Sequence, residues 1–426
     1  MRGPVLLGWL AAALGAGLAS AAAAFKDIAR DTLPYHREFV LFKSANMPRA
    51  DKLPNGVAFH SFMVPAVVTT VSGRILAFAE GRRYDNRNLD DVRIVFKRTK
   101  DGAKDGAKEG ARPEDWEDLQ ELVLKAGGVW GNPTPVVDGQ TIYLFMNWHD
   151  REYSQHGRDR LHTGRKTRKV DKSWKGRRHL FLTQSTDDGK TWTEPQDVTK
   201  QLTPRRRAWD AVGPGNGIVL LTNEIVVPAM GRNIVGRGPP GVRSWTYKEL
   251  PGSGPEGTIV QTPNGMLYRN DRGKDEIEYE TDRDRLANRY RRVARGDLRH
   301  FPPFSLDKEL PDPVCAAAML LYNHADAKEP ARVVFLNSAD QATRRAMRVR
   351  ISYDKEAKKF LVNRKLSDAP VVDAGFEGGY SSLTKTADTY IGALVETNFD
   401  QTGGTKSDFR AIIWRKFNLS WILHGR

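Results

Sequence analysis

Cysteine is almost absent from this chain of 426 residues, which contains one, Cys315. A single cysteine excludes an intramolecular disulfide and a zinc site built from several cysteines. Acidic residues are outnumbered as well, because 67 Lys and Arg stand against 52 Asp and Glu, for a net charge of +15. This excess favours a nucleic acid, an anionic membrane or an acidic substrate as the partner, and motifs are needed to choose between them.

Long hydrophobic runs are absent beyond the N-terminus. A basic second residue precedes an apolar run from Val5 to about Leu18, and small residues fill positions 19–24. A basic start, a short apolar stretch and a zone of small residues are typical of a secretory signal peptide. We expect residues 1–24 to be that signal and the mature chain to begin near Phe25. The protein would then be secreted or lie in the lumen of the secretory pathway, with an uncleaved membrane anchor as the alternative.

Helical periodicity is rare too, and short runs typical of β-strands dominate. The turns between them often carry Asp-Gly or Asn-Gly, as at 138–139, 188–189 and 264–265. Strands spread evenly to the C-terminus, with no shift in composition, predict one all-β domain over residues 25–426, a propeller or a large sandwich. The expected strands are 75–79, 92–96, 141–146, 179–184, 218–221, 224–227, 258–261, 332–336, 348–352, 390–396 and 410–415.

Two segments break the strand pattern. Residues near 101–115 are small and charged, and we expect a solvated insertion there. The second insertion covers residues 156–178, and its stretch 158–178 holds ten Lys or Arg and two Asp, a net charge of +8. A solvated surface loop and a binding surface for polyanions or anionic membranes are both open for it. Specific nucleic-acid binding is not indicated, because Trp174 is the only aromatic residue of the stretch other than histidine.

Residues 185–192 read Ser-Thr-Asp-Asp-Gly-Lys-Thr-Trp, which matches the aspartate-box pattern Ser-x-Asp-x-Gly-x-Thr-Trp. Such a sequence is expected to cap a hairpin: the Asp side chain accepts from turn amides, the Gly takes a positive φ and the Trp packs beneath. Degraded copies begin at Thr99 and Ser352, and a third candidate lies at 295–297. Repeats tens of residues apart indicate the blades of a propeller.

Other segments extend a resemblance to one family from about His60 to the C-terminal Ser420-Trp421. The chain resembles the sialidases (neuraminidases), glycoside hydrolases with aspartate-box (BNR) repeats. The resemblance implies a six-bladed β-propeller and release of terminal sialic acid from sialylated glycans, glycoproteins or glycolipids. We expect no cofactor, and we expect no metal because no run of Asp and Asn residues has the spacing of a calcium-binding loop. The segments that carry it are 78–83, 131–135, 213–218, 256–272, 312–315, 344–352 and 379–383.

The chemistry of a sialoside sets the residue types that such a site requires. The sugar carries a carboxylate on its anomeric carbon, and planar Arg side chains bind a carboxylate through paired hydrogen bonds. A carboxylate nucleophile would be repelled by that group, and sialidases use Tyr instead. The phenol needs a neighbouring carboxylate base because its free pKa is about 10, and a general acid must protonate the leaving oxygen.

The resemblance assigns these roles to matched positions. Tyr380, followed by Ser-Ser-Leu, matches the nucleophile, and Glu256 matches its base. Arg272 and Arg344 match the second and third arginines that bind the carboxylate. Arg82 matches the arginine that contacts the substituents of the sugar ring.

One departure from the family pattern concerns carboxylate binding. The first family arginine lies in a Tyr-Arg-Ile-Pro-type motif, whereas this strand reads Phe-Met-Val-Pro, with Met63 in the arginine's place. The loss of one desolvated Arg contact is expected to weaken carboxylate binding by about 2–4 kcal/mol. Glu396 matches the carboxylate that normally braces this arginine, so it would be a buried charge in need of another partner.

A second departure concerns the catalytic acid. The family's Asp position holds Asn88, which cannot donate a catalytic proton. Asp85, Asp90 and Asp91 share the loop, and Asp90 is our candidate for a substitute acid. An exo-sialidase of altered efficiency, acting on sialic acid or a related acidic sugar, is therefore the first hypothesis. A catalytically impaired propeller that binds glycans is the second, and a polyanion-binding protein is the third.

Overall fold

A computed structural model describes residues 29, 32–101, 110–122, 127–273, 289–326, 328–367, 369–371, 374–398 and 409–424. The expected signal peptide at 1–24 lies outside these residues, and so does 102–109, the centre of the first insertion. Among the described residues, no helix has both the length and the apolar character needed to cross a membrane.

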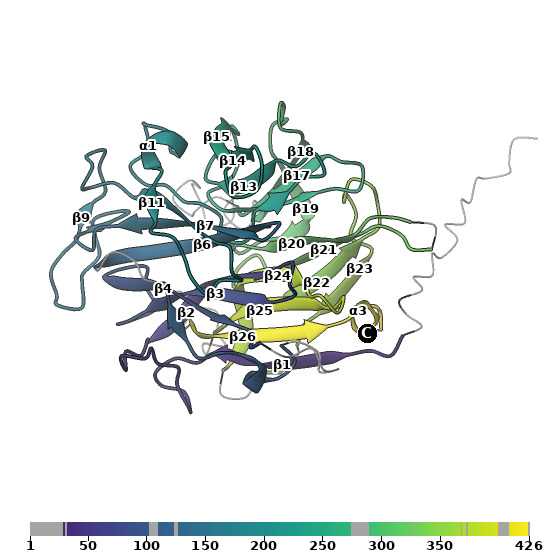
Figure 1. The fold of residues 1–426 in the computed structure, drawn as a ribbon, viewed down its shortest axis with the longest axis horizontal. Helices are drawn as coiled ribbons and strands as arrows, with labels where there is room; N and C mark the ends of the chain where they lie inside the picture. The colour runs from purple at the N-terminus through teal and green to yellow at the C-terminus, as the bar shows by residue number, and fades with distance from the viewer. Residues whose placement is uncertain are drawn as a thin grey trace, which may run out of the picture.

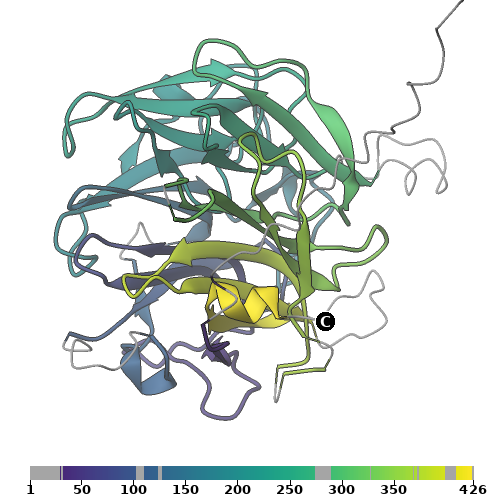
Figure 2. The same ribbon diagram turned by 90° about the vertical axis from the view of Figure 1, so that its right-hand side faces the viewer.

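Nearly all the regular structure is β-strand (Figures 1 and 2). Four of the sheets have four antiparallel strands, and a fifth has eight strands. The eight-stranded sheet consists of two antiparallel blades that a short parallel pairing of β4 (Asp91–Arg98) with β6 (Gly128–Asp138) joins, so the described chain forms six blades. The first blade is β2 (Ser61–Thr69), β3 (Ile75–Arg82), β4 (Asp91–Arg98) and β5 (Gln120–Glu121), and the second is β6 (Gly128–Asp138), β7 (Thr141–His149), β10 (His179–Ser185) and β11 (Gln196–Asp197). The third blade is β12 (Ile218–Val219), β13 (Ile225–Ala229), β14 (Arg232–Arg237) and β15 (Ser244–Glu249), and the fourth is β16 (Gly257–Gln261), β17 (Leu267–Asp271), β18 (Tyr290–Gly296) and β19 (Ser305–Pro311). The fifth blade is β20 (Ala318–Asn323), β21 (Arg332–Ser338), β22 (Met347–Ser352) and β23 (Val362–Lys365), and the sixth is β24 (Phe376–Lys385), β25 (Ile391–Asn398), β26 (Phe409–Phe417) and β1 (His36–Phe42). Outside the blades lie β8 (Tyr153–Ser154), β9 (Arg168–Lys169), the 3-10 helix η2 (Pro113–Asp115) and the helices α1 (Thr199–Leu202) and α3 (Leu419–Leu423).

The blades close into a ring. The first strand of each blade is its inner strand, and the inner strands contact one another in the cycle β2, β6, β12, β16, β20, β24 and back to β2. The N-terminal strand β1 pairs with β26, so the last blade combines both ends of the described chain. This arrangement confirms the six-bladed β-propeller.

Every expected strand is present, but several inner strands were not predicted. The inner strand β2 is buried along almost its whole length, and β6 and β24 are nearly as deeply buried. Strands buried on both faces lose the alternation of polar and apolar residues that marks a strand in a sequence. Gly and Pro interrupt these three strands as well, and their pairing shifts register at a bulge in each one. These bulges shape the site described below.

The aspartate box has the geometry that its sequence predicts. The Asp187 carboxylate accepts hydrogen bonds from the backbone and hydroxyl of Thr191, at 2.9 and 2.6 Å. Gly189 has φ +79°, and the Trp192 ring packs edge-on against Phe78 of the preceding blade. The box therefore closes its own turn and also fastens one blade to the next.

The copy that begins at Ser352 forms a similar cap. Its Asp354 accepts from the Ser352 hydroxyl at 2.9 Å and from the backbone amides of Lys358 and Lys359. The candidate at 295–297 forms a smaller turn, in which Asp297 accepts from two amides. The copy at Thr99 runs into residues outside the described part.

Candidate active site

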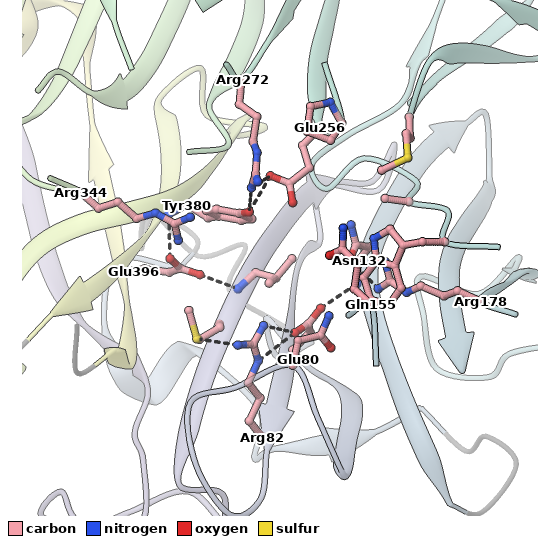
Figure 3. A pocket seen from close by; sticks show the side chains of 17 residues that line it. Glu80, Arg82, Asn132, Gln155, Arg178, Glu256, Arg272, Arg344, Tyr380 and Glu396 are labelled. Carbon is pink, nitrogen blue, oxygen red and sulfur yellow. Dashed lines mark hydrogen bonds and ion pairs between the residues drawn. The ribbon is translucent and has the colours of Figure 1, made fainter. Parts of the chain in front are cut away.

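A cavity of about 280 Å³ is lined in part by residues from the bulged segments of β2, β6 and β24, and Figure 3 shows it from close by. The structure brings Met63, Arg82, Asn88, Glu256, Arg272, Arg344, Tyr380 and Glu396 together in its lining, and Asp90 is absent from it. The charged lining residues are four arginines and three glutamates: Arg82, Arg178, Arg272, Arg344, Glu80, Glu256 and Glu396. This balance suits a small anionic ligand.

Tyr380, Glu256 and Arg272 form a closed triangle of hydrogen bonds. The Tyr380 hydroxyl donates to Glu256 Oε2 at 2.5 Å. Arg272 Nη1 donates to the same carboxylate oxygen and to the Tyr380 oxygen, each at 2.7 Å. Burial raises the pKa of Tyr380 well above its ordinary value, and the charge of Arg272 opposes this effect. The phenol is therefore protonated at rest, and Glu256 is placed to accept its proton.

Arg344 lies beside this triangle. Its guanidinium sits 5.1 Å from the centre of the Tyr380 ring, and its Nη2 donates to the Val314 carbonyl at 3.0 Å. A Cβ at Gly378 would collide with the backbone carbonyl of Arg344, so glycine allows β24 to approach this residue. Arg272 and Arg344 thus flank the phenol, and their planar guanidinium groups are suited to bind a carboxylate there.

Glu396 is fully buried, and backbone amides hold it. Its two oxygens accept from the amides of Val64 at 2.7 Å and Tyr380 at 2.8 Å. Both amides lie at strand bulges, where the register shift releases them from the sheet. Burial raises the pKa of Glu396, and these two hydrogen bonds lower it. The bulges therefore supply two hydrogen-bond donors to the buried carboxylate of Glu396.

Met63 contacts a different arginine. Its sulfur accepts from Arg82 Nη1 at 3.1 Å, and Arg82 also binds Glu80 Oε2 through Nε at 3.0 Å and Nη2 at 2.6 Å. The other Glu80 oxygen accepts from the backbone amide of Asn132 at 2.9 Å, again at a bulge. Arg82 is thus fixed by a buried carboxylate, and sequence reasoning missed Glu80 although it lies within the quoted segment 78–83.

Asn88 lines the cavity, and its Oδ1 is buried without a hydrogen-bond partner among the described residues. The carboxylates near it in sequence lie elsewhere: Asp85 pairs with Arg87, and Asp90 Oδ2 accepts from the backbone amide of His162. The structure therefore does not bring Asp90 to the cavity as a substitute acid. The physical reason is that its buried carboxylate is turned toward the second insertion.

Arg178 closes the opposite wall of the cavity and was not singled out from the sequence. It is buried, its guanidinium lies 4.4 Å from the centre of the Trp209 ring, and its Nη2 donates to Asn132 Oδ1 at 3.0 Å. Burial lowers the pKa of Arg178 to about 10, so it remains charged at neutral pH. The sequence did not point to Arg178, because it lies in a run of cationic residues that are typical of a surface. Gln155 also lines the cavity, and no motif in the sequence pointed to it.

Within the described ranges, no three His, Cys, Asp or Glu side chains are grouped so that they could hold a metal ion.

Residues 64–239 match the model of the family described as "BNR repeat-like domain". An exo-alpha-sialidase of Aspergillus fumigatus is 58% identical over 403 residues, covering 94% of this chain and 95% of the relative. The chain belongs to the sialidase family.

Two further likenesses agree with this membership. An exo-alpha-sialidase of Arthroderma benhamiae is 55% identical, with 94% of this chain and 93% of that relative covered. In three dimensions the sialidase fold resembles the intramolecular trans-sialidase from Ruminococcus gnavus, with a TM-score of 0.62 at 15% identity over 86% of this chain and 96% of the other. This sialidase thus keeps the family architecture.

Proposed function

We propose that this sialidase releases terminal sialic acid, or a related acidic sugar, by a retaining mechanism with Tyr380 as nucleophile and Glu256 as its base. The 2.5 Å hydrogen bond from the Tyr380 hydroxyl to Glu256, with Arg272 against both, carries the proposal. Glycan binding alone requires cations for the carboxylate, but it gives no role to a phenol paired with a base. The curated relatives named exo-alpha-sialidase support the same reading.

The first half of the reaction forms a covalent sugar–tyrosine bond. Arg272 and Arg344 bind the sugar carboxylate and place the anomeric carbon beside the Tyr380 oxygen. That oxygen attacks the anomeric carbon while its proton passes to Glu256, and the bond to the aglycon breaks with its electron pair on the aglycon oxygen. The carboxylate on the anomeric carbon stabilises the positive charge that develops on the ring, and the arginines hold that carboxylate in place.

The second half returns the enzyme. Water attacks the anomeric carbon from the side that the aglycon left, the bond to Tyr380 breaks, and the tyrosine takes its proton back from Glu256. In a complete site the acid of the first half would accept the proton of this water. Asn88 can donate a hydrogen bond but cannot exchange a proton, so the water proton passes to solvent. Both halves are therefore slowed where proton transfer matters.

The lack of an acid at Asn88 selects among substrates. General acid catalysis contributes about 10²–10⁴-fold to a rate, and an aglycon that leaves as a stable anion does not depend on it. We therefore expect appreciable turnover of aryl sialosides and slow turnover of natural sialosides, in which the leaving group is a hydroxyl of another sugar. The site would distinguish its substrates mainly by their leaving group.

A second candidate function is glycan recognition without turnover. The observation that favours it is the pair Met63 and Asn88, since one removes a carboxylate contact and the other removes the acid. Such a protein would bind sialylated glycans through Arg272 and Arg344 and would not change them.

One experiment separates these two functions. A 3-fluorosialosyl fluoride has a leaving group that needs no acid, and the neighbouring fluorine slows hydrolysis of the covalent intermediate. We expect the purified protein to gain the mass of one fluorosialosyl group on the peptide that contains Tyr380, and Tyr380→Phe to gain none. Release of the aryl group from an aryl sialoside should accompany this labelling. Binding of sialyllactose without labelling and without aryl release would instead establish the recognition function.

A further inference from the structure

The second insertion packs against the loop that carries Asn88. His162 of the insertion donates from its backbone amide to Asp90 Oδ2 at 2.9 Å, and its ring Nδ1 donates to the same oxygen. The His162 ring also stacks on Tyr84, with the ring centres 3.7 Å apart and the planes 17° apart. Each of these contacts joins the insertion to residues 83–90, and none lies within the cavity.

Asp90 makes this junction necessary. Its residue is 3% exposed and has φ +73°, a left-handed conformation that must be stabilised by surrounding contacts. Its other oxygen, Oδ1, is buried with no partner among the described residues. A buried carboxylate without partners is strongly unfavourable, so the two donors of His162 satisfy a group that would otherwise push the loop toward solvent.

The loop links this junction to the cavity. Asn88, two residues before Asp90, lines the cavity, and Arg82 Nη1 donates to the carbonyl oxygen of Asn86. A shift of the loop would therefore displace the side chain in the acid position and remove one of the contacts that fix Arg82. Arg178, the last residue of the insertion, lines the cavity as well, and so does Gln155, the residue immediately before the insertion.

We propose that the second insertion is a wall of the active site and that His162 is a positioning residue, which acts through Asp90 to hold the Asn88 loop. His162 does not touch the sugar in this scheme. The proposal rests on the proposed function for the claim that the sugar binds in this cavity, and on the contacts of Asp90 for everything else. It gives the basic insertion a role that its charge did not suggest.

The test compares three variants of the full chain. His162→Ala removes the ring donor, His162→Asn keeps a short side-chain donor near the same place, and His156→Ala is a control in an exposed residue of the same insertion. Two quantities are measured: amide hydrogen exchange of residues 83–91, and the Kd for the 2,3-dehydro derivative of sialic acid. Loss of one hydrogen bond to a buried charge predicts exchange about tenfold faster and binding about tenfold weaker for His162→Ala. His162→Asn should recover most of both, and His156→Ala should change neither.

Several outcomes would overturn the proposal. The first is that residues 83–91 of His162→Ala exchange at the wild-type rate. The second is that exchange becomes faster over all blades, and the third is that His156→Ala has the same effect as His162→Ala. The exchange measurement requires no ligand and no turnover. If the wild-type protein fails to bind the sugar derivative, the proposed function fails, while the exchange rates still decide whether His162 holds the loop.

Discussion

Arg82 donates a 3.1 Å hydrogen bond to the sulfur of Met63, the residue that stands where the family pattern has its first arginine. A thioether is a weak acceptor and cannot bind a carboxylate. Glu396, which matches the brace of that arginine, instead accepts from the amides of Val64 and Tyr380. If Met63 occupies the position of the family arginine, as the sequence predicts, two backbone amides replace that cation as the partners of Glu396.

Met63→Arg should restore the missing carboxylate contact. Glu396 lies next to this position and would gain a cationic partner, while Arg82 would lose its contact with sulfur. We expect the Kd for the 2,3-dehydro derivative of sialic acid to fall by a factor of tens, corresponding to about 2 kcal/mol, because repulsion from Arg82 offsets part of the gain. Calorimetric titration measures it, and Met63→Leu serves as the uncharged control. Binding that does not tighten would show that Met63 is not the position of the first arginine.

Asn88→Asp should restore general acid catalysis. The new carboxyl group would take the place of the Asn88 amide in the cavity lining, where Oδ1 has no hydrogen-bond partner among the described residues. We expect kcat/KM for sialyllactose to rise by about 10²-fold, since that is the lower end of general acid catalysis, and kcat/KM for an aryl sialoside to rise far less. Asn88→Ala should raise neither. An equal rise on both substrates would argue against an acid role for this position.

The propeller and most of the residues that line the cavity could be predicted from the sequence, because motif segments point to both. The aspartate box at 185–192 and the evenly spaced strands predicted a propeller, and the matched segments brought Tyr380, Glu256 and Arg272 to one cavity. The inner strands β2 and β24 were missed because burial on both faces removes the alternation that reveals a strand, and because Pro65 interrupts β2 and two glycines interrupt β24. Their bulges could not be foreseen, and these bulges supply the amides that hold Glu396.

Contacts between segments far apart in sequence also escaped prediction. Arg178 belongs to a run of surface cations, yet it is buried against Trp209 in the cavity wall. Asp90 seemed near enough to Asn88 to replace it, but its buried carboxylate accepts from His162, 72 residues away, and is turned away from the cavity. Spacing along a chain places a residue on a loop, and the packing of that loop decides which way its side chain points.

Asp187→Ala should destabilise the fold in a pH-dependent manner. Burial raises the pKa of Asp187, but hydrogen bonds from Thr191 and Ser185 outweigh this effect and leave the pKa below its ordinary value. A lowered folded-state pKa gives stability that is fully present above the unfolded pKa of about 4 and is lost as the pH falls through the folded value. We expect a loss of about 1–2 kcal/mol in the free energy of unfolding at pH 7. The loss should shrink below pH ~4.

Urea unfolding of wild type and Asp187→Ala at pH 7 and pH 3.5 measures this difference. Asp187→Asn is the matched control, because it keeps an acceptor without a titrating charge. A difference between wild type and Asp187→Ala that stays the same at both pH values would contradict a role for the ionised carboxylate.

The surface charge of the second insertion can be tested separately from its contacts with the active site. Deleting residues 158–178 would remove His162 and Arg178 together, so it would damage the cavity as well as remove the charge.

Lys166, Arg168 and Lys169 are exposed and form no ion pair within the described part of the chain. We expect their joint replacement by Gln to weaken binding to vesicles with anionic lipids, and to weaken it more at low salt than at 0.5 M salt, because exposed charges are screened. The free energy of unfolding and the Kd for the sugar derivative should stay unchanged. Joint replacement of Lys355, Lys358 and Lys359, which lie in another blade, is the control. Unchanged vesicle binding after replacement of Lys166, Arg168 and Lys169 would contradict a role of the insertion in binding anionic surfaces.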